Sequence, residues 1–128
     1  MTAEENLIMQ YQILGIPNYN GIAFLDSVLG SLEGQTARNF EVIFVDNGST
    51  DGSCSFVAGN YSWVHIIELP ENYGFCRAVN EGIRAAKAPY VLLLNNDTEV
   101  AEDFVEQMLS AIRRHKTHFL RSQNGSVS

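Results

Sequence analysis

Asparagine and aspartate side chains that could bind a cation and phosphate groups gather in three short polar segments. These segments are Pro17–Asn20, Asp46–Asn47 and Asn95–Asp97. In the third, Asp97 has the amide of Asn95 two residues before it, so that both could direct oxygens at one hard cation. Mg2+ and Mn2+ are typically held by one or two carboxylates together with substrate phosphates. The pattern therefore makes Asp97 the first candidate for a metal ligand.

Each candidate carboxylate also has a plainer interpretation. Asp97 and Thr98 could form a turn or cap the last predicted helix. Asp46 could shape the turn before Gly48 instead of accepting hydrogen bonds from a base or ribose. Asp51 is expected to cap a short helix rather than to bind a ligand. The residues alone leave the alternatives for Asp46 and Asp97 open.

Two further candidates lie on a predicted helix that runs from about Gly74 to Ala86. Arg77 could reach a phosphate group with two parallel hydrogen bonds, and Asn80 lies one turn later. By position alone, a solvated side chain is the favoured interpretation for Arg77, and Asn80 carries the same alternative. The three histidines and two cysteines show no metal or catalytic pairing, and the cysteines are expected to be reduced thiols.

The elements that must position these residues follow from alternating apolar runs and helical patterns. The predicted strands are Gln12–Ile16, which Pro17 closes, Glu41–Val45, Val64–Ile67 and Tyr90–Leu94. The first two predicted helices are Phe24–Leu32, which Gly34 ends, and a short helix through Ala58. A third helix, Gly74–Ala86, has Phe75, Val79, Ile83 and Ala86 on one face. A last helix has Phe104, Val105, Met108, Leu109 and Ile112 on one side.

Strands that alternate with helices predict a parallel sheet with right-handed crossovers. In open sheets of this kind, ligands bind beyond the carboxyl ends of the strands. The three polar segments each follow a predicted strand, so we expect them to converge at one edge. The fold class is therefore α/β, a Rossmann-like parallel sheet of about four strands with flanking helices.

Length and composition narrow the function classes. A chain of 128 residues with 45% hydrophobic and 18% charged residues predicts one folded domain. The net charge is -7, and all 15 acidic residues lie before residue 107, which disfavours nonspecific binding of nucleic acid. The chain has no dinucleotide, Walker A, nucleophile-elbow or zinc-protease motif. Without a long apolar run or a basic leader, a soluble, cytoplasmic protein is expected.

Taken together, the motifs resemble the nucleotide-sugar-binding half of an inverting family-two glycosyltransferase with the GT-A fold, in its rhamnosyltransferase-like branch. They occur in the family's order and spacing and cover about residues 11 to 112. The matching segments are Ile16–Gly21, Gln35–Thr36, Asn39–Val42, Val45–Gly52, Asn72–Phe75, Asn80–Ile83 and Leu92–Val100.

The resemblance implies a role for each candidate. Those that would line the nucleotide pocket are Pro17, Asn18 and Asn20. Asp46 would bind the base or ribose. The segment Asn95, Asn96 and Asp97 stands where the family has its Asp-x-Asp metal motif.

Within that motif, Asp97 matches the last carboxylate and would bridge Mg2+ or Mn2+ to the donor diphosphate. Asn95 replaces the first Asp, which suggests weaker metal binding or dependence on the phosphates of the donor. Arg77 and Asn80 match the helix that flanks the donor pyrophosphate and ribose.

The family mechanism is a single displacement at the anomeric carbon, with a carboxylate base that deprotonates the acceptor hydroxyl. In the family this base lies well downstream of the metal motif, and no residue from 98 to 128 falls at its place, so the catalytic residue is unknown. We therefore expect a truncated, incomplete GT-A fold: a domain over residues 1–116 and a basic, disordered tail over 117–128. A fragment is the favoured explanation, and a natural short form with a tail that docks on a membrane or partner is the alternative.

The leading hypothesis is a donor-binding domain for a UDP- or dTDP-linked sugar with Mg2+ or Mn2+. Transfer to an acceptor glycan or lipid-linked saccharide would need a complementary half. The alternative is a non-catalytic nucleotide-binding or interaction module. An exposed sheet edge predicts self-association. The expected location is the cytoplasm, with the inner face of the membrane as the second possibility.

Overall fold

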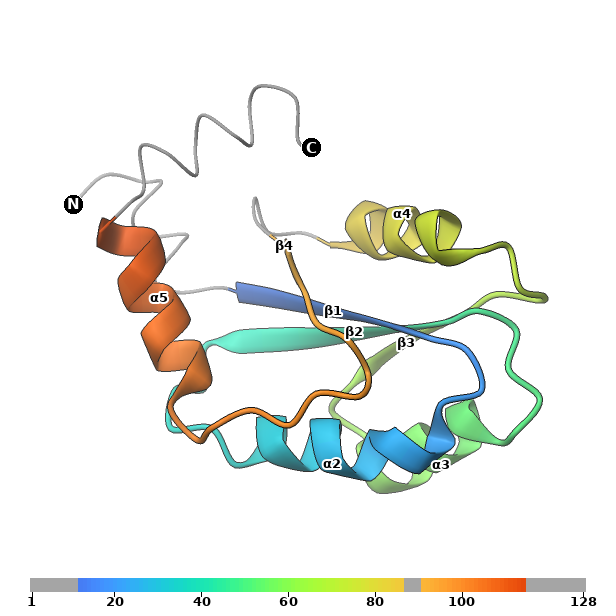
Figure 1. Ribbon diagram of the computed structural model, residues 1–128, viewed down its shortest axis with the longest axis horizontal. Helices are drawn as coiled ribbons and strands as arrows, with labels where there is room; N and C mark the ends of the chain where they lie inside the picture. Colours follow the sequence, from blue (N-terminus) through green and yellow to red (C-terminus); the bar gives the residue numbers. More distant parts are fainter. Residues whose placement is uncertain (1–11, 87–90, 115–128) are drawn as a thin grey trace.

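The computed structural model describes residues 12–86 and 91–114, in which a four-stranded parallel sheet carries helices on both faces (Figure 1). The strands lie in the order β3-β2-β1-β4, and every neighbouring pair is parallel. Their bounds are β1 (Gln12–Asn18), β2 (Phe40–Asp46), β3 (His65–Glu68) and β4 (Val91–Leu93). The predicted α/β fold with a parallel sheet is therefore confirmed.

The helices form a layer on each side of this sheet. α2 (Ile22–Glu33) and α3 (Ser53–Asn60) lie on one face, and α4 (Phe75–Ala85) lies on the other (Figure 1). α5 (Phe104–Arg114) lies near the amino ends of the strands. Its first turn is tied to the loop after α2, where Gln35 Oε1 accepts a hydrogen bond of 2.8 Å from the backbone N–H of Val105.

The two faces of the sheet carry apolar clusters of different size. The larger cluster joins the sheet to α2 and α3, and its members are Leu14, Ile16, Leu25, Val28, Leu29, Leu32, Val42, Phe44, Val57, Tyr61, Val64, Leu94 and Val105. The smaller cluster lies beneath α4 and consists of Ile13, Ile43, Val45, Leu69 and Ala78. Burial of apolar surface is the main stabilising term in folding, so most of the fold's stability comes from the α2 and α3 side.

The predicted apolar face of α4 is wrong. Phe75 and Ile83, which the periodicity places toward the core, are 62% and 51% exposed. The buried residues of the helix are the small ones, Ala78 and Gly82. A Cβ atom at Gly82 would lie 3.1 Å from Cγ2 of Val45, so the helix approaches the sheet closely through these residues. Its larger apolar side chains are thereby left at the surface.

Pro17 does not end β1, as the sequence had suggested, but lies within it and pairs with Val45. The backbone of Gly15 faces β4, since its carbonyl accepts a hydrogen bond from Leu94 N–H. In a parallel ladder the next residue that faces the same way is Pro17. The paired register of β4 ends at Leu93, beside Gly15, so the N–H that proline lacks is not needed there.

The other element predictions are confirmed within about two residues, including the stop of α2 at Gly34. Two further predictions lie outside the described residues: Tyr90 as the start of the fourth strand, and the tail over 117–128. The domain boundary at residue 116 also lies there and stays a prediction. In the described ranges, no helix has the length and apolar character needed to cross a membrane.

Candidate functional site

A cavity of about 450 Å³ opens at the carboxyl ends of β1, β2 and β4, where the three polar segments meet. The first turn of α4 closes its remaining side. The described residues that line it are Pro17, Asn18, Tyr19, Asn47, Asn72, Gly74, Phe75, Ala78, Asn95, Asn96 and Asp97. The predicted convergence at one sheet edge is therefore confirmed for Pro17, Asn18 and the Asn95–Asp97 segment.

Asn18 connects all three strand ends through its side chain. Its amide nitrogen donates to Asp46 Oδ1 at 2.9 Å and to Ser49 Oγ at 3.3 Å. Its amide oxygen accepts a hydrogen bond of 2.7 Å from Nδ2 of Asn96. A Cβ atom at Gly21 would lie 2.3 Å from the same nitrogen of Asn96 and 2.5 Å from the Asn18 oxygen, so a larger residue there would displace this pair. The loop after β4 is thus held to the loops after β1 and β2.

Asp46 lies beneath the cavity, with 1% of its surface exposed. Besides the amide of Asn18, its carboxylate accepts hydrogen bonds from Ser49 N–H at 2.9 Å and from Ser49 Oγ at 2.7 Å. It does not belong to the described residues that line the cavity. In this structure Asp46 supports the floor of the site, and its predicted contact with a base or ribose stays a prediction.

Asp97 lines the cavity and is exposed. The plainer interpretation, in which it caps the last helix, is wrong, because α5 begins only at Phe104. The turn here is closed by the backbone, with Thr98 N–H donating to the carbonyl of Asn95 at 3.2 Å. No hydrogen bond of the Asp97 carboxylate occurs within the described part of the chain, so its oxygens are available to a ligand.

Asn20 does not reach the cavity. Its backbone has a positive φ of 50°, and its side-chain oxygen accepts a hydrogen bond of 2.8 Å from Thr50 N–H. Its own N–H donates to Ser49 Oγ at 2.8 Å. Asn20 therefore joins the loops after β1 and β2, and its predicted place in the nucleotide pocket stays a prediction.

Asp51 joins the starts of two helices, in line with the structural role expected for it. Its carboxylate accepts hydrogen bonds of 3.0 Å from the backbone N–H groups of Ser53 and Ile22, which begin α3 and α2. Burial raises the pKa of Asp51, but the hydrogen bonds from Ser53 and Ile22 outweigh it, so that the pKa falls below its usual value. Its side chain is therefore held as an anion that supports both helices.

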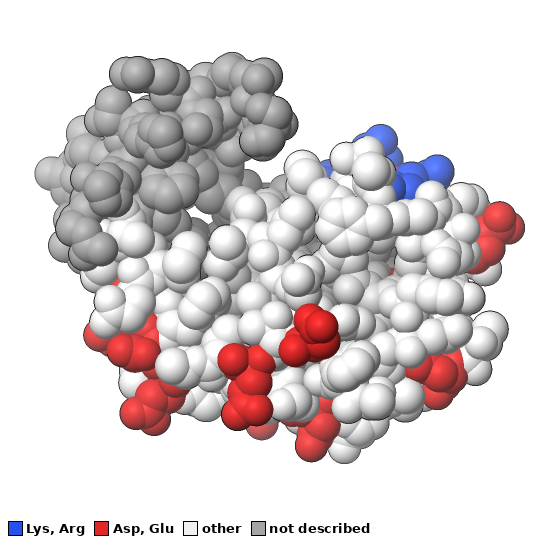
Figure 2. Space-filling view, viewed as in Figure 1, with Lys and Arg blue, Asp and Glu red and all other residues white. Residues whose placement is uncertain are grey.

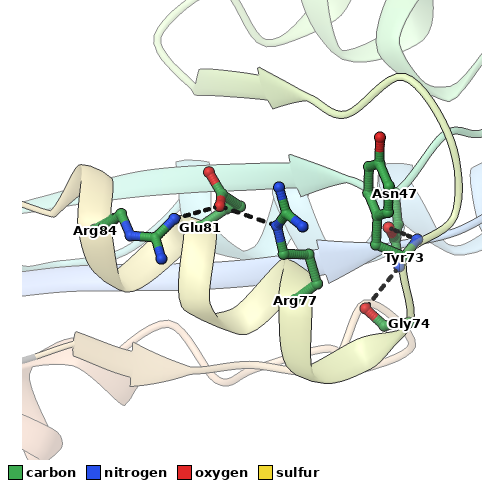
Figure 3. Close-up of polar contacts among 6 residues, drawn as sticks. All are labelled: Asn47, Tyr73, Gly74, Arg77, Glu81 and Arg84. Carbon is green, nitrogen blue, oxygen red and sulfur yellow. Dashed lines mark hydrogen bonds and ion pairs between the residues drawn. The ribbon is translucent and has the colours of Figure 1, made fainter.

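Asn47 holds the loop that leads into α4 (Figure 3). Its Nδ2 donates to Asn72 Oδ1 at 2.9 Å and to the carbonyl of Gly74 at 3.0 Å. Its Oδ1 accepts a hydrogen bond of 2.9 Å from the backbone N–H of Tyr73. Asn47 is 5% exposed, and α4 begins with the residue after Gly74. One buried amide thus places the wall of the cavity that α4 provides.

Arg77 and Asn80 are not among the described residues that line the cavity, although both are on α4. The Arg77 guanidinium carbon lies 4.7 Å from the ring centroid of Tyr73, and its Nε lies 3.2 Å from Oε2 of Glu81 (Figure 3). Arg84 binds the same carboxylate oxygen at 2.6 Å. Their predicted role beside the pyrophosphate and ribose stays a prediction.

Charge around the site is sparse. In the space-filling view, acidic side chains spread over the lower part of the face, and a small basic group lies over α4 (Figure 2). Among the described lining residues of the cavity, Asp97 is the single carboxylate, and the other polar side chains are the amides of Asn18, Asn47, Asn72, Asn95 and Asn96, with the hydroxyl of Tyr19.

These residues fit a weakly held divalent cation. Nowhere in the described residues do three histidine, cysteine, aspartate or glutamate side chains gather as a metal site would require. Mg2+ nevertheless often has only one or two carboxylates as protein ligands and takes its other ligands from water and substrate phosphates. Asp97 and Asn95 could hold such an ion together with a phosphorylated ligand.

Sequence reasoning missed about half of the lining residues. Asn47 directly follows Asp46 in the second polar segment but had no role assigned. Asn72 and Gly74 belong to a segment that carried the family resemblance, again without a role. Tyr19 lies in the first polar segment and Phe75 in the matching segment Asn72–Phe75, but neither had a role assigned. Exposed aromatic side chains at a cavity, here 49% and 62% exposed, are typical of ligand sites.

Comparisons with known proteins identify the family and agree with the fold. The profile of the family described as Glycosyl transferase family 2 matches residues 14–122. The chain belongs to this family. It is 30% identical over 101 residues to glycosyltransferase GlyG of Streptococcus pneumoniae serotype 4, which covers 77% of this chain and 34% of GlyG. Membership in the rhamnosyltransferase-like branch is a finer statement and stays a prediction.

Solved structures show the same fold. Residues 1-349 of S. aureus TarS, in complex with UDP-GlcNAc, superimpose with a TM-score of 0.76 at 24% identity, over 84% of this chain and 32% of that solved chain. Mannosyltransferase PcManGT from Pyrobaculum calidifontis, in complex with GDP-Man and Mn2+, gives a TM-score of 0.70 at 24% identity, over 83% of this chain and 32% of the PcManGT chain. The family-2 chain therefore has the α/β fold of these GT-A proteins and spans about a third of each of these two solved chains.

Proposed function

We propose that this family-2 chain is a nucleotide-sugar-binding domain that takes a UDP- or dTDP-linked sugar together with Mg2+ or Mn2+. The observation that carries the proposal is the cavity at the carboxyl ends of β1, β2 and β4, which Asp97 lines and where its carboxylate makes no hydrogen bond with the described residues. Two solved structures of the same fold contain UDP-GlcNAc, or GDP-Man and Mn2+, which supports a nucleotide sugar as the ligand of this chain.

The residues of the chain divide the work of binding. Asp97 and Asn95 would hold the cation against the diphosphate, and Pro17 with Asn18 would contact the nucleotide. The chemistry that a bound divalent cation supplies is stabilisation of negative charge on the departing diphosphate. Asn96 keeps the loop with Asp97 in place through its hydrogen bond to Asn18.

Inverting transfer to an acceptor glycan or lipid-linked saccharide is part of the proposal for the whole enzyme. It requires a base within reach of the acceptor hydroxyl. In the described lining of the cavity, Asp97 is the single carboxylate, and it is already assigned to the cation. This observation favours a second candidate, a non-catalytic nucleotide-binding module, if no other segment supplies the base.

Calorimetric titration of UDP and dTDP, with and without Mn2+, tests the proposal. We expect metal-dependent binding by the wild type and loss of that binding in Asp97→Ala. Glu102→Ala is the matched control, because Glu102 is exposed, lies outside the cavity and carries the same charge. A folded wild type that binds neither nucleotide would contradict the proposal. Binding without slow release of UDP from a UDP-sugar would favour the non-catalytic module.

Self-association through the sheet edge is a further part of the proposal. β4 stands at the end of the strand order of the described sheet, and Leu93 on it is 43% exposed. An open strand with apolar side chains is a template for pairing with another chain. Analytical ultracentrifugation is expected to show a concentration-dependent dimer, and a strict monomer at high concentration would contradict it. The cytoplasmic location and the inner face of the membrane stay predictions.

A further inference from the structure

The side chain of Asn47 joins the loop that follows β2 to the loop that precedes α4. Within the described residues, all of its side-chain hydrogen bonds are made with that second loop. Asn47 uses both N–H donors and its oxygen on Asn72, Tyr73 and Gly74. A side-chain amide has two donor hydrogens and one acceptor oxygen, so both donors are consumed. Although Asn47 lines the cavity, its side chain therefore serves the loop rather than a ligand.

Gly48 marks a second, independent contact between the same two loops. A Cβ atom at this position would lie 2.4 Å from the carbonyl carbon of Glu71, which is backbone and cannot swing away. Its φ of +78° is also a conformation that residues with a side chain rarely adopt. The two loops therefore approach one another backbone to backbone, directly beside the Asn47 hydrogen bonds.

The part of the molecule that these contacts hold has little other support. Gly74 has a φ of +93°, and a Cβ atom built on it would meet no atom within 4 Å. Phe75, the first residue of α4, is 62% exposed, and the helix buries only Ala78 and Gly82. In the first turn of α4, Ala78 alone is buried against the sheet, so the loop before the helix supplies the remaining contacts that place this turn.

We propose that Asn47 is a positioning residue for nucleotide binding, which sets the width of the cavity on the side formed by Phe75 and Ala78. The inference rests on the proposed function, because it assumes that a nucleotide occupies the cavity. Asparagine is required, since an aspartate could accept from Tyr73 N–H but would turn a carboxylate oxygen toward the carbonyl of Gly74. Asn72 is its partner, because Asn72 Oδ1 also accepts a hydrogen bond of 2.8 Å from Gly74 N–H.

Two single variants and their combination test this role. In Asn47→Ala, Asn72→Ala and the double variant, we would measure UDP affinity with Mn2+ by calorimetry and amide hydrogen exchange of Tyr73 by NMR. Asn47→Ala removes three hydrogen bonds and Asn72→Ala removes two. We expect UDP binding weaker by about tenfold in each variant and, in Asn47→Ala, Tyr73 exchange faster by at least about tenfold. Because both side chains act on one loop, the double variant is expected to lose no more affinity than the worse single variant.

The controls separate positioning from general stability. Asn60→Ala removes a hydrogen bond of 2.9 Å to Phe56 at the end of α3, far along the chain from the cavity loops, and is expected to keep wild-type affinity. Asn72 is exposed, so Asn72→Ala remains informative even if Asn47→Ala fails to fold. A purely structural Asn47 would lower the melting temperature without changing the dissociation constant for UDP.

The outcomes that would overturn the inference are distinct. Unchanged UDP affinity in the folded variants, or additive losses in the double variant, would contradict a shared positioning role. Unchanged exchange of Tyr73 in Asn47→Ala would contradict the loop contact itself. A wild type that binds no UDP would overturn the proposed function and the role in binding with it, while faster Tyr73 exchange in the variant would still establish that Asn47 holds the loop.

Discussion

The two faces of the sheet are built in different ways. On the α2 and α3 face, large apolar side chains such as Phe44 and Leu29 are fully buried. On the α4 face, the helix meets the sheet through Ala78 and Gly82 and leaves Phe75 and Ile83 exposed. The first face therefore supplies most of the stability, whereas the first turn of α4 on the second face also lines the cavity. Truncation of a large side chain should cost more folding free energy on the first face than on the second.

The largest contrast is expected between a leucine on α2 and an isoleucine on α4. Leu29→Ala removes a fully buried side chain and should lower the free energy of unfolding by about 2–5 kcal/mol. Ile83→Ala removes a half-exposed one and should change it by less than about 0.5 kcal/mol. Urea unfolding followed by the fluorescence of Trp63, the single tryptophan of the chain, measures both. Equal losses would contradict the difference between the faces.

The two cysteines report on the same contrast. Burial, together with the carboxylates of Asp46 and Glu68, raises the pKa of the Cys54 thiol on α3 to about 12, whereas Cys76 on α4 is exposed. Because the thiolate is the reactive form and Cys54 holds little of it near pH 8, Cys54 should react about a hundredfold more slowly with a disulfide reagent.

Counting the thiols released by that reagent at pH 8 checks this prediction. We expect one fast and one slow thiol in the wild type, and loss of the fast one in Cys76→Ser. Raising the pH toward 12 should accelerate the slow thiol, since its thiolate forms only there. Two thiols that react at equal rates would show that the α3 side is as open as the α4 side.

A smaller effect is expected from glycines on the two faces. Gly82→Val would force α4 away from Val45 and should cost about 1–3 kcal/mol of unfolding free energy. At Gly59 in α3, a Cβ atom meets nothing within 4 Å, so Gly59→Ala should raise stability by up to about 1 kcal/mol through helix propensity. Thermal unfolding of both variants tests the pair. A Gly82→Val protein as stable as wild type would contradict the close approach of α4 to the sheet.

Sequence periodicity predicted the order of elements well, because strand and helix patterns depend on local spacing. It also placed the polar segments at one edge, since parallel strands bring their carboxyl ends together. It predicted the bounds of α4 but not its buried face, because residue spacing does not show that the small residues Ala78 and Gly82 allow the closest approach to the sheet. The predicted end of β1 at Pro17 was wrong for a similar reason. Whether a strand tolerates proline depends on whether a neighbouring strand needs its N–H, and local spacing does not show which strands are neighbours.

The sequence placed residues at the cavity correctly where a polar segment directly follows a strand, as at Asn18 and Asp97, while their roles in binding stay predictions. The role of Asn47 was not predicted, because its partners Asn72, Tyr73 and Gly74 lie about 25 residues further along the chain. Asp46 was named as a ligand contact, but the structure shows its carboxylate engaged by Asn18 and Ser49. The contact with Asn18 joins residues 28 positions apart and leaves no trace in local spacing, whereas the contacts with Ser49 belong to the local turn that was the alternative interpretation of Asp46.

Paramagnetic broadening by Mn2+ would test the central claim most directly. In the isotope-labelled chain, Mn2+ added with UDP should broaden the amide signals of Asn95–Asp97 and of Phe75, while those of Gly59 in α3 stay sharp. The same addition to Asp97→Ala should leave all of these signals sharp. Broadening elsewhere, or broadening at Asn95–Asp97 that persists in Asp97→Ala, would contradict a nucleotide and cation site at the carboxyl edge of the sheet.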